Sequence, residues 1–206
     1  MEDERIAKNP LSVNHGITPE NTGPKVNPTL YMAIIGSLMY LTASPPDIMF
    51  ATCLCTHYQA QPNVNHMLAA KKIMRYLKGT PSLGLWYPRK DGFDLTAFCD
   101  SDYRGCKRDF KSTSGDCQFL GSRLVSWQCK KQTAVAQSTC EAEYIAAASC
   151  TSQVIWIQQQ LRDYGTTTQR ADLFTKAFDR PHFLFLLNVL GVKDMAEVVS
   201  DRELLK

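Results

Sequence analysis

A long amphipathic segment, residues 138–161, constrains the fold of this chain more than any other feature. It begins with Ser138 and Glu141, which have the spacing of a capping box at a helix start. Six positions then recur at intervals of three and four, as residues on one helix face do, and all but the first are small or apolar: Glu143, Ala147, Cys150, Val154, Ile157 and Leu161. The pattern predicts one long helix with a buried face that Glu143 heads.

Glu143 is the residue that breaks this pattern. A carboxylate on a core-facing stripe costs free energy unless it is paired, hydrogen-bonded or bound to a metal. Glu141, two residues earlier, points about 200° away and is explained by capping. We therefore interpret Glu143 as a candidate site residue.

Asp100 is a second carboxylate in an unexpected place, inside the expected strand Leu95–Asp102. Alternation along a strand puts Phe98, Asp100 and Asp102 on one side, and acidic residues are depleted in strand interiors. The alternative is a strand end that turns into solvent. Carboxylates from a strand and a packed helix are the hard oxygen ligands that Mg²⁺ prefers, and two such ions can activate water for phosphodiester hydrolysis.

Short alternating or β-branched runs separated by polar turns follow Leu83. They predict strands at 83–87, 93–103, 113–121 and 123–132, of which the last three form an antiparallel meander. Before them, the apolar run 30–41 and the segment 48–58 predict two short buried helices, separated by Pro45 and Pro46. A last helical region is expected to begin near Ala171.

A third helix is predicted between Asn65, as its cap, and Gly79, with a buried stripe formed by Leu68, Ile73, Met74 and Leu77. Its other face carries three basic residues with the spacing i, i+4, i+7, which could track a phosphate backbone: Lys71, Arg75 and Lys78. A solvated lysine-rich face is the alternative.

Charge is distributed unevenly along the chain. The formal net charge is +3, yet residues 66–132 alone carry thirteen basic and six acidic residues, a net of +7. Association responds to local potential, so a polyanion is a plausible partner. The eight cysteines form no CxxC pair, the first ten residues lack a signal-peptide core, and no apolar run reaches membrane-spanning length. These features predict an intracellular protein, cytoplasmic or nuclear, without membrane contact.

Several motifs, in order, resemble the C-terminal part of the Pol polyprotein of copia-type (Ty1-like) LTR retrotransposons. They are YMAIIGSLMYLTASPPDIMFA, AAKKIMRYLKGTPSLGLWY, FCDSDYRGCKRDFKSTSG, LVSWQCKKQTAVAQSTCEAEYIAA and ADLFTKAF, and the resemblance covers roughly residues 29–178. Residues 29–87 are similar to the end of the reverse transcriptase and its connection to the nuclease. Residues 92–176 are similar to the ribonuclease H domain.

The resemblance implies an α/β fold of the α+β kind, with a mixed sheet flanked by helices. It also implies an enzyme that hydrolyses the RNA strand of an RNA/DNA hybrid. In the family two Mg²⁺ ions are held by four acidic residues. On that resemblance Asp100 is the first acid, Glu143 the second and Asp172 the last, and these three are the expected catalytic residues and metal ligands. Lys130 and Lys131 join the basic helix face as expected nucleic-acid contacts. The polymerase site, with its paired aspartates, lies upstream in the family.

One departure from the family affects the expected activity. In the family a strand, a helix and a strand separate the long helix from the ADLFTK segment, and the first of those strands carries the third acid. Here only nine residues, 162–170, bridge them, whereas the missing elements need about 25. We therefore expect the third carboxylate and the parallel partner strand to be absent, and ribonuclease H activity to be impaired or lost.

The resulting prediction has four segments: a disordered linker at 1–28, a helical connection region at 29–87, a truncated ribonuclease H-like domain at 88–178 and a tail at 179–206. Its function is that of a Pol fragment acting on RNA/DNA hybrids with Mg²⁺, with the remaining Pol polyprotein segments as further partners. The alternative is a catalytically dead remnant that only binds nucleic acid. A third interpretation is a product that does not fold cooperatively.

Overall fold

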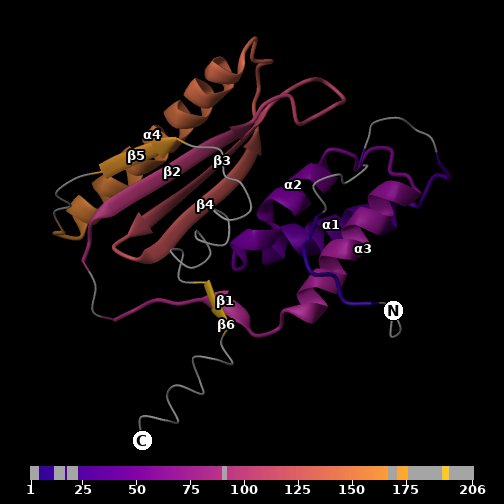
Figure 1. Ribbon diagram of the computed structural model, residues 1–206, viewed down its shortest axis with the longest axis horizontal. Helices are drawn as coiled ribbons and strands as arrows, with labels where there is room; N and C mark the ends of the chain where they lie inside the picture. The colour runs from indigo at the N-terminus through magenta and orange to yellow at the C-terminus, as the bar shows by residue number, and fades with distance from the viewer. Residues whose placement is uncertain are drawn as a thin grey trace, which may run out of the picture. The chain divides into compact units, whose positions relative to one another are not determined.

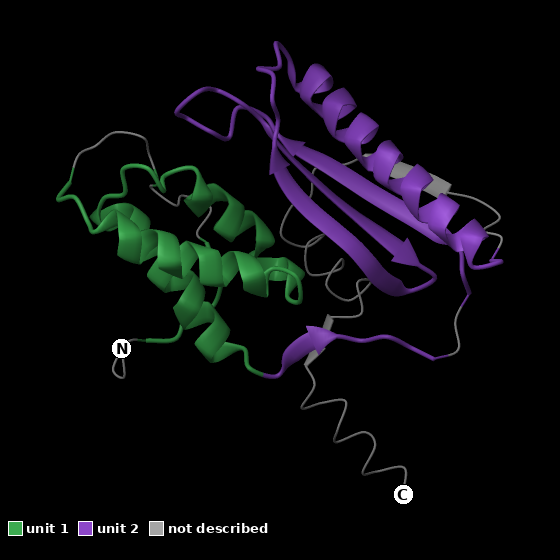
Figure 2. Ribbon diagram, turned by 180° about the vertical axis from the view of Figure 1, so that it is seen from behind, with its two compact units in different colours: residues 1–81 green, residues 82–206 purple. Residues whose placement is uncertain are grey.

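The computed structural model describes residues 5–11, 17, 23–89, 92–166, 171–175 and 192–194. The chain divides into two compact units, residues 1–81 and residues 82–206, shown in separate colours in Figure 2. We describe each unit by itself. The division falls at Pro81 and Ser82, six residues before the expected boundary. No helix among the described residues is long and apolar enough to cross a membrane.

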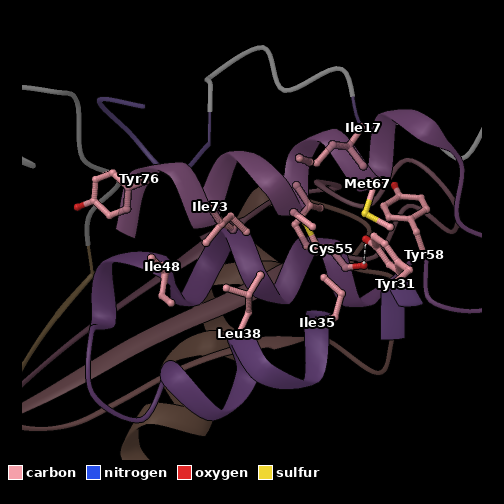
Figure 3. Packing of buried hydrophobic residues seen from close by; sticks show 14 residues of the cluster. Ile17, Tyr31, Ile35, Leu38, Ile48, Cys55, Tyr58, Met67, Ile73 and Tyr76 are labelled. Atoms are coloured by element: carbon pink, nitrogen blue, oxygen red, sulfur yellow. Dashed lines mark hydrogen bonds between the residues drawn. The ribbon is translucent and has the colours of Figure 1, made fainter. Parts of the chain in front are cut away.

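Unit 1 is built from helices. They are α1 (Pro28–Leu41), the 3-10 turn η1 (Pro46–Ile48), α2 (Met49–Thr56) and α3 (Val64–Gly79). Figure 3 shows how their buried side chains meet, with Ile35 and Leu38 of α1 and Ile73 of α3 in one cluster. The expected helix is confirmed in α1, but its burial is confined to one side, since Leu30, Met39 and Tyr40 are exposed.

Helix α3 begins two residues earlier than the sequence suggested. Asn63, not Asn65, is its cap: the Asn63 side chain accepts a hydrogen bond from the His66 N–H at 3.1 Å, and the Asn63 N–H donates to His66 Nδ1 at 3.1 Å. This reciprocal pair satisfies two backbone donors that a helix start leaves free. The earlier start goes with a rotated stripe, in which Met67 is buried and Leu68 is 51% exposed.

The described residues within 1–28 contribute contacts to unit 1, whereas we expected a disordered linker there. Ile17 is buried in the helical cluster, with Val26 packed partly against it. The Val26 N–H donates to the Pro62 carbonyl at 3.2 Å, and the Val64 N–H donates to the Pro24 carbonyl at 3.1 Å. These backbone bonds attach the segment to the start of α3.

Unit 2 contains the predicted antiparallel meander, which Figure 1 shows as three adjacent arrows. Strands β2 (Leu95–Asp102), β3 (Thr113–Leu120) and β4 (Arg123–Lys131) pair in sequence order, and Asp100 lies opposite Gly115. A further strand, β1 (Leu83–Leu85), pairs antiparallel with β6 (Val192–Asp194). The expected tail at 179–206 thus includes a strand.

The other edge of the sheet corrects two expectations. Residues Ala171–Thr175 form strand β5, not a helix, and β5 pairs parallel with β2 from Leu95 to Cys99. The parallel position beside β2, which we expected to be empty, is therefore occupied, but by the segment 171–175 and not by the strand that carries the third acid in the family. The connection from β4 to the parallel strand β5 must cross over the sheet, and parallel strands need a long connection for this. Helix α4 provides most of that length, so the short bridge after α4 is enough to return the chain to the sheet.

Helix α4 (Thr139–Asp163) confirms the long helix and covers the sheet. Its Cys150, Val154 and Ile157 pack on the β2 side chains Leu95, Ala97 and Cys99. Near its first turns the fully buried positions are Ala142 and Ala146, while Glu143 and Ala147 are half-buried. The predicted stripe is therefore confirmed from Cys150 to Ile157 and offset by one position in the first two turns, which leaves Glu143 at its margin.

Only one of the two hydrogen bonds of the predicted capping box forms at the start of α4. The Ser138 hydroxyl oxygen accepts from the Glu141 N–H at 3.1 Å, but the Glu141 carboxylate accepts from the Gln137 N–H at 2.6 Å instead of from the cap residue. Both bonds satisfy donors at the helix start, and the negative charge there favours the helix dipole.

Candidate functional site

Asp100 lies near the carboxyl end of β2, one residue after the last β2 position that pairs with β5. Its neighbour across the strand pair is Gly115, which has no side chain to cover that position. Asp100 is half-buried, and its Oδ1 atom is buried without a hydrogen-bond partner. Burial raises the pKa of Asp100, although hydrogen bonds from the Ser101 backbone and from Glu143 act in the opposite direction.

Glu143 reaches the same place from the second turn of α4. Burial, and then the nearby charge of Asp100, raise the pKa of Glu143, while hydrogen bonding from Ser101 opposes the shift. The pKa values of both carboxyls are thus raised, and a hydrogen bond between the two groups couples them. The structure thus places the two acids that the sequence singled out in one electrostatically coupled pair.

Both carboxyls retain unused acceptor capacity. Asp100 Oδ1 and Glu143 Oε2 are buried and accept no hydrogen bond. A buried carboxylate oxygen with no partner is costly unless a cation occupies the space beside it. Hard divalent cations bind to one or two carboxylates and complete their shell with water, so this donor pair fits such an ion. Within the described ranges no group of three or more metal-ligating side chains occurs.

Asp172 lies in β5, and its position follows from the strand register. It pairs with Thr96, four residues before Asp100, which corresponds to roughly 13 Å along the strand. The side chain of Asp172 lies outside the described residues, so its role as a metal ligand stays a prediction.

The predicted nucleic-acid contacts divide between the two units. Lys71, Arg75 and Lys78 lie on α3 in unit 1, on the face opposite the buried Ile73. Lys78 is exposed, whereas Lys71 and Arg75 are half-buried. Their contact with nucleic acid stays a prediction.

Lys130 and Lys131 end strand β4 in unit 2 and differ in their surroundings. Lys130 is exposed. The Lys131 Nζ atom forms a 2.7 Å salt bridge with Asp109 and donates to Cys106 Sγ at 3.1 Å. Burial lowers the pKa of Lys131, but the hydrogen bonds to Asp109 and Cys106 outweigh it and raise the pKa. The Lys131 ammonium thus already has an acidic partner within the protein.

Asp116 is a buried acidic residue that sequence reasoning missed. It lies on β3 opposite Cys99, is 7% exposed, and accepts hydrogen bonds from Gln118 Nε2 at 2.7 Å and Gln128 Nε2 at 2.6 Å. Burial raises the pKa of Asp116, although these two bonds lower it in part. Alternation along β3 was the available signal, because it places an acid on the face that α4 covers. With both oxygens hydrogen-bonded, Asp116 is satisfied within the protein.

Comparison with known proteins gives a consistent set of relatives. The retrovirus-related Pol polyprotein from transposon RE1 of Arabidopsis thaliana is 36% identical over 162 residues, which cover 74% of this chain and 11% of that polyprotein. The corresponding polyprotein from transposon TNT 1-94 of Nicotiana tabacum is 36% identical over 136 residues, which cover 66% of this chain and 10% of that polyprotein. This chain therefore spans about a tenth of the length of these Pol relatives.

A shorter relative is matched over nearly its whole length. The secreted RxLR effector protein 161 of Plasmopara viticola is 33% identical over 133 residues, which cover 64% of this chain and 94% of that protein. No protein-family model matches the chain. No solved structure matches it either.

Proposed function

We propose, on the premise that this chain belongs to the copia-type (Ty1-like) retrotransposon Pol polyproteins, that unit 2 is a ribonuclease H-like nuclease domain with impaired activity. Its reaction is hydrolysis of the RNA strand in an RNA/DNA hybrid. The observation that carries the proposal is the coupled pair Asp100 and Glu143, two half-buried carboxyls that each have one buried oxygen without a hydrogen-bond partner.

In this proposal Asp100 and Glu143 hold Mg²⁺, which when bound supplies positive charge for an attacking water and a leaving oxygen. Asp100 would contribute a carboxylate oxygen, because its buried Oδ1 atom accepts no hydrogen bond within the protein. A bound dication would favour the ionised forms of both carboxyls, because a nearby positive charge lowers a carboxyl pKa. The half-buried position of both residues limits competing water.

Impaired activity follows from the distance of Asp172. A two-metal site needs further carboxylates, and the β5 register sets Asp172 roughly 13 Å along the sheet from the level of Asp100. This register favours the second candidate function, a remnant that binds nucleic acid without cleaving it. In either case the other segments of a longer Pol polyprotein are proposed partners.

One experiment separates these functions. Purified chain is incubated with a labelled RNA/DNA hybrid in Mg²⁺, beside the variants Asp100→Asn, Glu143→Gln and Asp172→Asn, with Glu141→Gln as the matched control on the same helix. Weak cleavage that is lost in Asp100→Asn and Glu143→Gln, but kept in Glu141→Gln, supports the nuclease. Salt-sensitive hybrid binding without cleavage supports the remnant.

A further inference from the structure

The loop between β2 and β3, residues 103–112, carries an exposed aromatic ring in an unfavourable backbone conformation. Phe110 is 60% exposed and has a φ of 54°. A bulky residue in the left-handed region costs roughly 1–2 kcal/mol, and burial of the ring does not offset that cost here. Arg104, at the other end of the loop, also has a φ of 54°. The loop holds Phe110 outward at an energetic cost.

Backbone and side-chain bonds fix this conformation. The Phe110 N–H donates to the Cys106 carbonyl at 2.8 Å, and the Cys106 N–H donates to the Lys111 carbonyl at 3.2 Å. Cys106 is buried and anchors the loop. The Arg104 N–H donates to Ser112 Oγ at 3.2 Å. A surface ordered before binding loses less conformational entropy when a ligand arrives.

The charge of the loop is positive. Residues 103–112 include four basic residues and one acid, and that acid, Asp109, is paired with Lys131 at 2.7 Å. Burial pushes the pKa of Asp109 up, but the hydrogen bonds from Lys131, Cys106 and Lys111 outweigh it and lower the pKa to about 2. Asp109 is therefore ionised and neutralised by Lys131 at physiological pH. Arg104 and Lys107, in the same loop as Phe110, are exposed, and the Arg104 guanidinium lies 5.1 Å from the centre of the Tyr103 ring.

The loop also begins beside the carboxylate pair. It leaves the strand end that carries Asp100, and its first residue, Tyr103, donates from its hydroxyl to the Gln137 carbonyl at 3.2 Å. Gln137 immediately precedes the start of α4, whose second turn carries Glu143. The first residue of the loop is therefore anchored beside the start of the helix that carries Glu143.

We propose that this loop binds a single-stranded nucleic-acid segment, with a base stacked on Phe110 and phosphates contacted by Arg104 and Lys107. An exposed aromatic ring among cations is how proteins hold unpaired bases, because every base has a flat face for stacking. The inference rests on the proposed function and specifies its substrate further. The preferred substrate is an RNA/DNA hybrid with a single-stranded overhang and not a blunt-ended hybrid. Lys131 then acts as a positioning residue that holds Asp109 and the loop.

The test measures binding without cleavage, by fluorescence anisotropy in EDTA, for a blunt hybrid and for the same hybrid with an overhang. Wild type should prefer the overhang. Phe110→Asn should weaken overhang binding about tenfold, since a lost stack is worth about 1–3 kcal/mol, and leave blunt binding unchanged. Asn tolerates the left-handed backbone, so the loop keeps its shape. Phe110→Trp should restore the preference.

Two further variants separate stacking from charge. Arg104→Ala with Lys107→Ala should reduce the salt dependence of overhang binding by about 0.7 in logarithmic slope for each lost contact. Trp156→Ala, an exposed ring on the outer side of α4, and Arg162→Ala, about 28 Å along α4 from Glu143, should change neither measurement.

Several outcomes would overturn the inference. The first is equal affinity of the wild type for blunt and overhang hybrids. The second is that Phe110→Asn weakens binding of the blunt hybrid as much as binding of the overhang hybrid. The third is that the loop variants leave oligonucleotide affinity unchanged while they reduce binding of the protein to anionic lipid vesicles. Overhang preference that depends on Phe110, in a protein that cleaves nothing in Mg²⁺, would sustain this inference while the nuclease proposal fails.

Discussion

Replacing Glu143 with glutamine should stabilise unit 2 while it removes a proposed metal ligand. Glu143 Oε2 is buried without a partner and lies beside a second carboxyl, and both groups have a raised pKa. Glutamine keeps one acceptor oxygen and turns the other atom into a donor that can reach Asp100. An unsatisfied buried polar atom costs about 1–3 kcal/mol, and because Glu143 is only half-buried we expect a gain of about 1 kcal/mol.

The stability that Glu143→Gln gains over wild type should increase as the pH rises. A carboxyl whose pKa is raised in the folded protein binds its proton more tightly there than in the unfolded chain. Wild type therefore loses stability as the pH rises from the ordinary carboxyl range through the raised pKa values of the pair, and Glu143→Gln loses less. The difference between the two proteins should vanish below about pH 4, where both acids are protonated.

Thermal unfolding followed by tryptophan fluorescence measures this effect, because Trp86, Trp127 and Trp156 all lie in unit 2. A gain of 1 kcal/mol raises the Tm of a unit of this size by about 4 °C. Glu141→Gln is the matched control with the opposite sign. It weakens the 2.6 Å bond to the Gln137 N–H and removes a favourable charge at the helix start, at a cost of about 0.3–1 kcal/mol. Equal shifts in the two variants at pH 7, or destabilisation by Glu143→Gln, would refute the reasoning.

Two further outcomes follow from the structure. Mg²⁺ at ten times its dissociation constant should stabilise wild type by about 1.4 kcal/mol and leave the Tm of Glu143→Gln nearly unchanged, measured by the same fluorescence melts. Asn63→Ala should destabilise unit 1 by about 0.5–2 kcal/mol in urea unfolding followed by circular dichroism, because it removes the 3.1 Å cap bond to the His66 N–H. Asn65→Ala, at a residue that is exposed, should be close to neutral, and equal losses in the two variants would contradict the assigned cap.

The meander and the long helix could be predicted because their signals are local. Alternation at 95–102 and the polar turns that follow each strand define β2, β3 and β4 without knowledge of their partners. Helix α4 is marked by Ser138 and by three- and four-residue spacing. Its buried face was predicted correctly at Cys150, Val154 and Ile157 and was one position out only in the first two turns, because small rotations of a helix are resolved only by packing on the sheet.

The start of α3 could not be chosen from the sequence alone. Asn63 and Asn65 are both good caps, and the choice depends on a hydrogen bond between the Asn63 N–H and the His66 ring. Strand β5 was missed for a related reason. Residues 171–175 are too few to distinguish a strand from a helix by periodicity, and their pairing with β2 spans about 75 positions of sequence.

The candidate site was found through residues that contradict their surroundings. Asp100 in a strand and Glu143 on a core-facing helix both break a hydrophobic pattern, and such breaks are visible in any sequence. Asp116 breaks its strand pattern as well, but its hydrogen bonds to Gln118 and Gln128 become visible only when β3 and β4 are paired. Those bonds distinguish a satisfied buried acid from one with free acceptor atoms.

The sequence by itself determined the helices of unit 1, the antiparallel meander, the long helix and the two unusual carboxylates, because each depends on residues within a few positions of one another. The tertiary structure decided that β5 occupies the parallel position beside β2, that Asp172 lies opposite Thr96, and that Lys131 pairs with Asp109. These outcomes depend on contacts between residues far apart in the chain. Their free energy comes from burial and pairing that no local pattern encodes.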